Sequence, residues 1–200
     1  MRKSYFTSLL LAAAVILGAS NASAGPLDSP GAQKSLVCSA CHGFAGNARG
    51  NHVPILAGMN ANYFKKAIKD YAEGKRSSPE MEPYSKYVIQ FGIDEMAAYF
   101  AEQKRQPTGI KADPKAVARG KAQAGPCIVC HNPQGEGEAE KGIPVLQGQP
   151  ADYLQAQMIV LKEDKRKLED ATLDELKKKL LKRLGDREIA DLAAYYSSLR

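Results

Sequence analysis

Apolar positions along the chain recur with a helical period in several segments. From Tyr63 to Tyr71 apolar residues return every three or four positions, and the same spacing appears over Asp94 to Phe100 and Glu188 to Leu199. No segment shows a convincing two-residue alternation of the kind that marks a half-buried strand. Asp113 followed by Pro114 predicts a further helix start, with the aspartate as N-cap and the proline in the first turn. The pattern predicts an all-α fold.

A basic segment near the C-terminus also has helical spacing. Thr172 and Glu175 have the spacing of a capping box, which predicts a helix start at Thr172. The following residues, 177–182, read KKKLLK and indicate a basic amphipathic helix. Its ordinary interpretation is a solvated lysine face.

The chain repeats itself. Four landmarks occur in the same order in each half, which indicates a duplicated unit. Each half is expected to run helix, cysteine motif, loop, helix, loop, helix. The paired landmarks are Cys38–His42 with Cys127–His131, Val53–Gly58 with Ile143–Gly148, Tyr63-Phe64 with Tyr153-Leu154, and Ala97–Phe100 with Ala193–Tyr196.

Proline and glycine interrupt the pattern between the two halves, at Gln106 to Gly109. We therefore expect one domain over residues 25–107 and a second over 108–200. A unit of this size with long loops buries only a thin core of its own. A large apolar cofactor in each half would supply the missing contacts.

Residues 1–24 have the features of a secretory signal peptide. Arg2 and Lys3 precede an apolar run over Leu9 to Ala19, and Ala22-Ser-Ala24 supplies the small residues of a cleavage site. The run is shorter than the roughly 20 residues that a membrane helix needs. We expect an exported, periplasmic protein without a transmembrane segment. Losing Arg2 and Lys3 reduces the formal charge from +6 by two, and export makes a nucleic-acid partner improbable.

The four cysteines form two Cys-x-x-Cys-His motifs. Exported cysteines commonly form disulfides, but this pentapeptide is the attachment motif of c-type haem. Cys38 and Cys41, like Cys127 and Cys130, would bind the two vinyl groups of a porphyrin. The adjacent histidine, His42 or His131, would be the proximal iron ligand. A redox dithiol or half a zinc site are the alternatives, and each would require the histidine to recur by coincidence.

These motifs and the landmarks around them resemble the dihaem cytochrome c4 family, which consists of two fused class I cytochrome c domains. The resemblance covers nearly the whole chain after the leader, and it rests on the paired landmarks together with Glu73–Arg76. It implies two covalent haems and an electron carrier that serves a periplasmic or membrane-bound oxidase, reductase or dehydrogenase. It also implies that the carbonyls of Pro54 and Pro144 accept a hydrogen bond from the proximal histidines.

The sixth ligand of the first iron is expected to be Met81. The family has a methionine at this place, in a loop between the two C-terminal helices of the domain, and Pro79 and Pro83 flank Met81 here. Met59 is the competitor, but the second half has Gln149 at the equivalent position. A thioether opposite the histidine raises the reduction potential of a cytochrome.

The second half departs from the family at this ligand. Alignment from the N-terminal landmark places Ala171 opposite Met81, and alignment from the C-terminal landmark places Lys177 there. The methionine of this segment, Met158, occupies the position of Ile68 within a helix. Three outcomes stay open: ligation by Lys177, ligation by Met158, or an open or water-bound site.

These features favour an electron carrier over an enzyme. Two of the chain's three histidines lie in the motifs, none stands ready as a distal acid, and no long catalytic insertion is present. The alternative is a haem enzyme or ligand sensor that uses an open or unusually ligated second haem.

Overall fold

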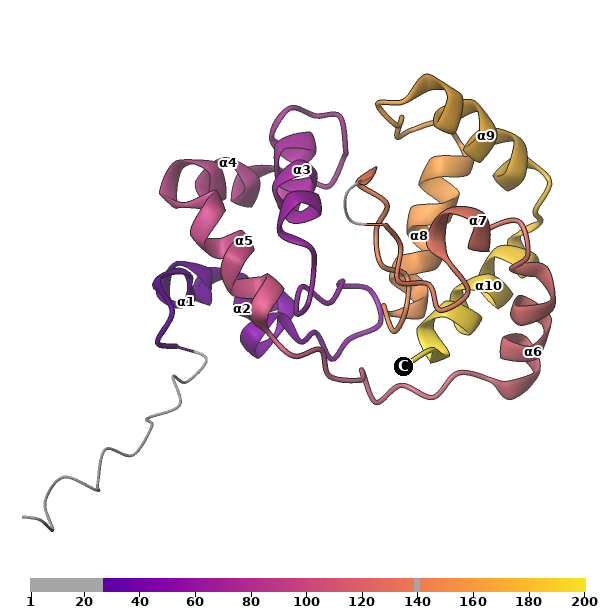
Figure 1. Ribbon diagram of the computed structural model, residues 1–200, viewed down its shortest axis with the longest axis horizontal. Helices are drawn as coiled ribbons and strands as arrows, with labels where there is room; N and C mark the ends of the chain where they lie inside the picture. The colour runs from indigo at the N-terminus through magenta and orange to yellow at the C-terminus, as the bar shows by residue number, and fades with distance from the viewer. Residues whose placement is uncertain (1–26, 139–140) are drawn as a thin grey trace, which may run out of the picture.

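The computed structural model describes residues 27–138 and 141–200, so the expected leader lies outside the described residues. Figure 1 shows two helical lobes side by side, joined by an irregular segment between helices α5 and α6. In the described ranges β pairing is limited to one isolated bridge, Glu138 to Ile143, which confirms the all-α prediction. No helix within these ranges is both long and apolar enough to cross a membrane.

The first lobe is built around one apolar core. The core is formed by Phe64 and Ile68 of α3, Val88 of α4, and Met96 and Phe100 of α5. The helices are α1 (Pro30–Ser35), α2 (Ser39–His42), α3 (Ala61–Ala72), α4 (Met81–Phe91) and α5 (Ile93–Glu102), with single 3-10 turns at Leu36–Cys38 and Phe44–Gly46.

The second lobe repeats this arrangement. Its core is formed by Leu154 of α8 and by Leu192, Ala193, Tyr195 and Tyr196 of α10. The helices are α6 (Pro114–Gln123), α7 (Ile128–His131), α8 (Ala151–Lys162), α9 (Ala171–Lys182) and α10 (Asp186–Ser198).

A glycine lets the first and last helices of each lobe cross closely. A Cβ on Gly31 of α1 would lie 2.0 Å from the carbonyl oxygen of Glu95 in α5. A Cβ on Gly120 of α6 would lie 2.0 Å from the carbonyl oxygen of Asp191 in α10. Each half therefore has the same close helix crossing, in which there is no room for a side chain at the glycine.

The helix starts confirm some of the sequence predictions and correct others. Asp113 caps α6, because its side chain accepts from the N–H of Lys115 at 3.1 Å. Helix α9 is capped by Asp170, which accepts from the N–H of Leu173 at 2.9 Å, so the prediction of a cap at Thr172 is wrong. An aspartate two residues earlier provides the stronger cap and draws Thr172 into the helix.

Helix α4 was not predicted, and Met81 was expected in a loop. Met81 is instead the first residue of α4. The helix was not expected because proline usually interrupts a helix. Pro83, however, lies in the first turn of α4, where a missing N–H breaks no intrahelical bond. Ser78 further supports the start, because its hydroxyl accepts from the N–H of Met81 at 3.2 Å.

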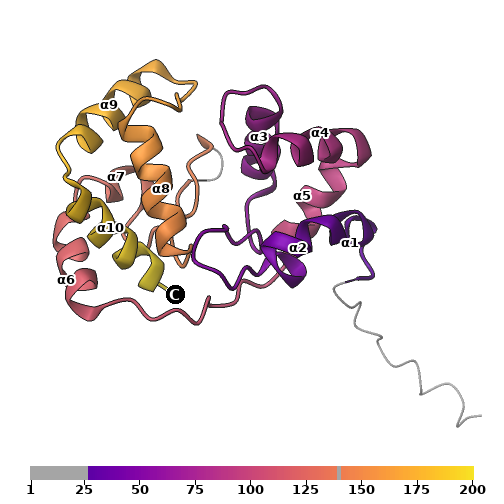
Figure 2. The same ribbon diagram turned by 180° about the vertical axis from the view of Figure 1, so that it is seen from behind.

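Figure 2 shows the two lobes from behind. Backbone and side-chain hydrogen bonds join them. The side-chain amide of Gln149 bonds both the N–H and the carbonyl of Ile55, each at 2.9 Å. Arg105, from the connecting segment, donates to the carbonyls of Ala57 at 3.2 Å and Gln147 at 2.6 Å. The loops that precede α3 and α8 are thereby tied to each other and to the connecting segment.

Asn51 of the first lobe completes the start of helix α8 in the second. The N-cap of α8 is Pro150, which has no side-chain hydrogen bond to offer. The carbonyl of Asn51 accepts from the N–H of Tyr153 at 3.0 Å, and its side-chain oxygen accepts from the N–H of Asp152 at 3.4 Å. The equivalent helix α3 is capped within its own lobe, by Asn60 on the N–H of Tyr63.

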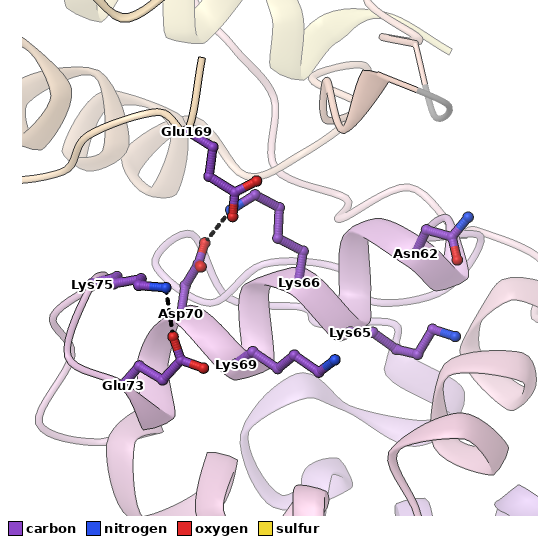
Figure 3. Close-up of a pocket in the computed structure, with 8 residues that line it drawn as sticks. All are labelled: Asn62, Lys65, Lys66, Lys69, Asp70, Glu73, Lys75 and Glu169. Carbon is purple, nitrogen blue, oxygen red and sulfur yellow. Dashed lines mark hydrogen bonds and ion pairs between the residues drawn. The ribbon is translucent and has the colours of Figure 1, made fainter. Parts of the chain in front are cut away.

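An ion triad spans the surface between the lobes. Lys66 of α3 lies 2.8 Å from Asp70 on the same helix and 3.2 Å from Glu169 of the second lobe, and Figure 3 shows it between them. The side chain of Glu169 is 73% exposed, so solvent screens this contact. The triad therefore contributes little to the stability of the junction.

Candidate haem-binding sites

Both Cys-x-x-Cys-His motifs end on a single helical turn. Cys38 closes a 3-10 turn and Cys41 lies in α2, whereas Cys127 caps α7 and Cys130 lies within it. Residues three apart in such a turn share one face, so both thiols of a pair point the same way. No disulfide joins any of the four cysteines, so all of them are available for thioether bonds to haem. Burial raises the pKa of Cys38 to about 11, which keeps that thiol neutral and protonated.

Each motif histidine is held by a proline carbonyl. Nδ1 of His42 lies 2.9 Å from the carbonyl oxygen of Pro54, and Nδ1 of His131 lies 3.1 Å from that of Pro144. A carbonyl can only accept, so each Nδ1 carries the proton. Burial lowers the pKa of both imidazoles and the proline carbonyl offsets only part of this effect, so the rings are neutral. Nε2 of each ring is left with a free lone pair for a metal.

The second lobe holds a cavity of about 400 Å³ against its motif. Cys127, Cys130 and His131 form one wall, and helices α8 and α9 form others. The α8 residues are Tyr153, Leu154, Gln157, Met158 and Leu161, and the α9 residues are Leu173, Leu176, Lys177, Leu180 and Leu181. A largely aliphatic space beside two thiols and a neutral imidazole suits a porphyrin.

Buried positive charge lies beside this cavity. Arg76 is 4% exposed, and its guanidinium donates to two neutral groups of the second lobe, the hydroxyl of Tyr153 at 2.9 Å and the amide oxygen of Gln157 at 2.8 Å. Its Nε is buried without a hydrogen-bond partner among the described residues. Arg166, in the cavity wall, donates to the same Gln157 at 3.1 Å.

Both arginines affect the pKa of Tyr63 in the first lobe. Burial raises the pKa of its phenol, but the nearby Arg76 and Arg166 outweigh that effect, and the net pKa is lowered. Among the described residues neither buried Arg76 nor half-buried Arg166 has a carboxylate partner, and this calls for an anionic ligand, because an uncompensated buried charge is costly. Haem carries two propionates, so the residues present fit this cofactor.

In the first lobe, Met81 and Cys38 pack against the same core cluster. The position of Met81 is fixed by its own helix, since its carbonyl accepts from the hydroxyl of Ser85 at 2.6 Å. The structure thus brings the thioether of Met81 to the core that also receives one haem-binding thiol. Met59, the competing thioether, packs against this core as well.

In the second lobe, Lys177 and Met158 both line the cavity, whereas Ala171 does not. The ammonium of Lys177 lies 2.6 Å from Oδ1 of Asp174 and donates to the carbonyl of Arg166 at 3.0 Å. Ala171 is exposed at the first turn of α9. The structure therefore leaves two sequence candidates beside the second site, one of them held in an ion pair.

Residues that reach this cavity from the other lobe were not predicted from the sequence. Met59 and Tyr63 lie in its wall together with Arg105 of the connecting segment. Periodicity reports which face of a helix is buried and says nothing of which lobe buries it. Met59 and Gln149 occupy equivalent positions of the repeat but differ in polarity, and both lie at the junction of the lobes. This difference was the sequence feature that could have indicated the junction.

Two helical lobes, each with paired thiols and a carbonyl-held neutral imidazole, define a dihaem c-type cytochrome. A family model for cytochrome c matches residues 117–200. The cytochrome c4 of Pseudomonas aeruginosa is 34% identical over 178 residues, with 84% of this chain and 87% of that protein covered. The chain belongs to the cytochrome c4 family. It is an electron-transfer protein with two covalently bound c-type haems.

Two further relatives bear on structure and role. The crystal structure of reduced cytochrome c4 from Pseudomonas stutzeri matches with a TM-score of 0.76 and 28% identity, covering 84% of this chain and 96% of that one. A protein of Stutzerimonas stutzeri named thiosulfate dehydrogenase electron acceptor is 28% identical, with 82% of this chain and 80% of that protein covered. These relatives confirm the fold and the electron-transfer role expected from the sequence.

Proposed function

We propose that this dihaem cytochrome is a periplasmic electron carrier that shuttles single electrons between an oxidoreductase and a terminal acceptor, and catalyses no reaction of its own. The observation that carries the proposal is the shared wall between the two sites. Met59 and Tyr63 of the first lobe line the cavity of the second. Two redox centres separated by so little protein suit relay of electrons through one molecule.

The proposal assigns the chain as a leader over residues 1–24, a first haem domain over 25–107 and a second over 108–200. Support for the boundary comes from the packing, in which α1 contacts α5 while α6 contacts α10. The thioether bonds would form at the thiols of Cys38, Cys41, Cys127 and Cys130.

His42 and Met81 are proposed as the axial ligands of the first iron, and His131 as the proximal ligand of the second. Support comes from the neutral, carbonyl-held imidazoles and from the place of Met81 against the first core. Ligation by Lys177 stays a prediction, and it requires that the ammonium lose a proton and leave Asp174.

The bound haems supply reversible one-electron exchange at iron. The chain's own residues set how easily that exchange occurs. The carbonyls of Pro54 and Pro144 fix the histidine rings, which limits rearrangement between oxidation states. Aliphatic side chains of α8 and α9 exclude water. Buried Arg76 would offset propionate charge and so favour the reduced state, which carries one more electron.

We propose a periplasmic dehydrogenase of an inorganic sulfur compound as one electron donor. Support comes from the relative of Stutzerimonas stutzeri whose name describes it as an electron acceptor of thiosulfate dehydrogenase. That relative covers most of this chain, so the comparison applies to both lobes.

The alternative function, a haem enzyme or ligand sensor, draws support from helix α9, whose cavity face carries four leucines and one lysine but no thioether or imidazole. The carrier and the sensor differ in whether the second iron binds an added ligand. Reduced, purified protein titrated with carbon monoxide should bind substoichiometric amounts if both irons are six-coordinate. Rapid binding of one molecule per chain would favour the sensor.

The donor is tested separately by mixing oxidised protein with a purified thiosulfate dehydrogenase and its substrate. Reduction of both haems within one enzyme turnover time is expected. A pyridine haemochrome measurement on the same sample must return two haems per chain. A chain that is reduced by dithionite but not by the dehydrogenase would overturn this choice of partner and leave the carrier role in place.

A further inference from the structure

We propose that Met158 of helix α8 supplies the axial thioether of the second haem, so that the two halves of the chain draw this ligand from different helices. The inference rests on the proposed ligation of the second iron by His131. It concerns the position opposite that histidine, for which α9 offers no methionine.

Met158 lies at the centre of the face that α8 turns to the cavity. Leu154 stands one turn before it and Leu161 one turn after it, and both line the same space as Cys127 and His131. The two neighbouring leucines contribute no donor atom. Tyr153 and Gln157, the polar α8 residues of the wall, hydrogen-bond to Arg76, so the thioether is the unengaged donor that α8 presents to the cavity.

Lys177, the other candidate ligand on the sequence, already has hydrogen-bond partners. The ammonium of Lys177 holds Oδ1 of Asp174 at 2.6 Å and the carbonyl of Arg166 at 3.0 Å, and its side chain is 11% exposed. Asp174 is itself buried and also accepts from the N–H of Leu168 at 2.7 Å. Ligation by Lys177 would break two bonds, expel a proton and take a partner from a buried carboxylate.

Met158 packs against the core cluster of its own lobe, but among the described residues its side chain has no hydrogen bond or ion pair to give up. A thioether is neutral, needs no deprotonation and forms at most weak hydrogen bonds. Its unbranched side chain also adapts readily to the shape of a cavity. On energetic grounds the soft, neutral donor is favoured over the engaged ammonium.

The other cavity methionine, Met59, belongs to the first lobe. It packs against the core cluster of that lobe as well as lining the second cavity. Its counterpart in the repeat is Gln149, which bonds the loop residue Ile55 next to Pro54, the partner of the other proximal histidine. By the symmetry of the repeat, Met59 faces the proximal loop of the second site rather than the position opposite His131.

Comparison of the halves shows where the donor has moved. The first half has Met81 on α4 and a buried Ile68 on α3. The second half has Met158 at the position of Ile68, while the cavity face of α9 is leucine-rich. Each half thus keeps one candidate axial thioether on its own helices, and in the second half that thioether lies one helix earlier in the chain.

The test uses the ferrous and ferric holoprotein. A methionine bound to low-spin ferrous haem has a strongly upfield-shifted methyl resonance, and the ferric form shows a weak far-red sulfur-to-iron absorption. Wild-type protein should show two such methyl resonances. Met158→Leu should abolish one of them, halve the far-red absorption and create one carbon monoxide site per chain.

Three matched variants complete the test. Met81→Leu should abolish the other methyl resonance, whereas Met59→Leu and Lys177→Ala should leave both in place. A single methyl resonance in wild-type protein, with axial spectra that change in Lys177→Ala, would overturn the inference even if Met158→Leu does not fold. Loss of a haem from wild-type protein in the pyridine haemochrome assay would instead count against haem attachment at the second motif.

Discussion

The side-chain amide of Gln149 holds the backbone of Ile55 at both of its polar groups. Its Oε1 accepts from the Ile55 N–H and its Nε2 donates to the Ile55 carbonyl, each at 2.9 Å. Both residues are buried. Because Ile55 follows Pro54, the partner of His42, this pair of bonds connects the second lobe directly to the proximal loop of the first haem site.

Replacement of that amide should loosen the junction. Gln149→Leu removes two buried hydrogen bonds and leaves two backbone groups unpaired, which should lower the free energy of unfolding by about 2–4 kcal/mol. Urea denaturation of the holoprotein measures the change. Gln134→Ala, on an exposed loop side chain, is the control and should change little. An unchanged midpoint in Gln149→Leu would mean that water replaces the amide at no cost.

The symmetric position offers the reverse experiment. Met59 and Val145 are the repeat counterparts of Gln149 and Ile55, and both line the second cavity. Met59→Gln should add the missing pair of bonds and raise the free energy of unfolding by about 1 kcal/mol. Met59→Leu, which adds no polar group, should not. Equal effects of the two substitutions on the denaturation midpoint would refute this account of the asymmetry.

Removal of buried positive charge should lower a reduction potential. Arg76 is 4% exposed and bonds groups that line the second cavity. Arg76→Leu should lower at least one haem potential by on the order of 60 mV, which is tenfold in a one-electron equilibrium. Arg183→Leu, an exposed charge, should cause a much smaller shift. Spectroelectrochemical titration measures both variants, and equal shifts would show that only net charge matters.

Asp174 should make the α9 region sensitive to acid. Hydrogen bonds from Lys177, the N–H of Leu168 and Lys178 hold its pKa below the ordinary value. Its stabilisation is therefore complete above a pH of about 4, the pKa of an unfolded aspartate, and is lost as the pH falls below it. This one group should contribute a slope of at most about 1.4 kcal/mol per pH unit.

The slope is measured by urea denaturation at several values of pH, on wild-type protein and on Asp174→Asn. The variant should be less stable at neutral pH and should lose part of the acid dependence. Asp186→Asn, at a 93% exposed side chain, is the matched control. Parallel pH profiles for Asp174→Asn and wild-type protein would contradict the assignment.

The close helix crossings should tolerate no side chain. Gly31→Ala and Gly120→Ala each place a methyl group 2.0 Å from a carbonyl oxygen of the facing helix, so each should destabilise its lobe by about 1–3 kcal/mol or more. Gly50→Ala and Gly125→Ala, where no atom lies within 4 Å, are the controls. Thermal unfolding that gave the four variants the same midpoint would exclude close packing as the reason for these glycines.

Local chemistry made much of this molecule predictable. Paired thiols beside a histidine have one common use in an exported chain, and the repeat doubled that evidence. Asp113 with Pro114 marked a helix start correctly because cap and first-turn preferences are local. Helix α4 was not predicted, because Pro83 indicates a helix break unless its place in the first turn is known.

Contacts between the halves could not be predicted in the same way. Nothing in the periodicity of α3 indicates that Tyr63 lines the cavity of the other lobe. Arg76 reads as a surface cation in a loop, yet it is buried against Tyr153 because the two lobes close over it. Long-range pairing of this kind depends on how two finished units meet, and a linear pattern does not encode that directly.

Asn51 makes the two halves unequal as folding units. It satisfies the first N–H groups of α8, a helix whose own N-cap is a proline. Cut at residue 107, the chain would release a first lobe that keeps the Asn60 cap of α3, and a second lobe in which the first N–H groups of α8 lack their partner. The two halves of the repeat are thus no longer interchangeable, because α8 of the second half begins on a residue of the first, whereas the equivalent helix α3 is capped within its own lobe.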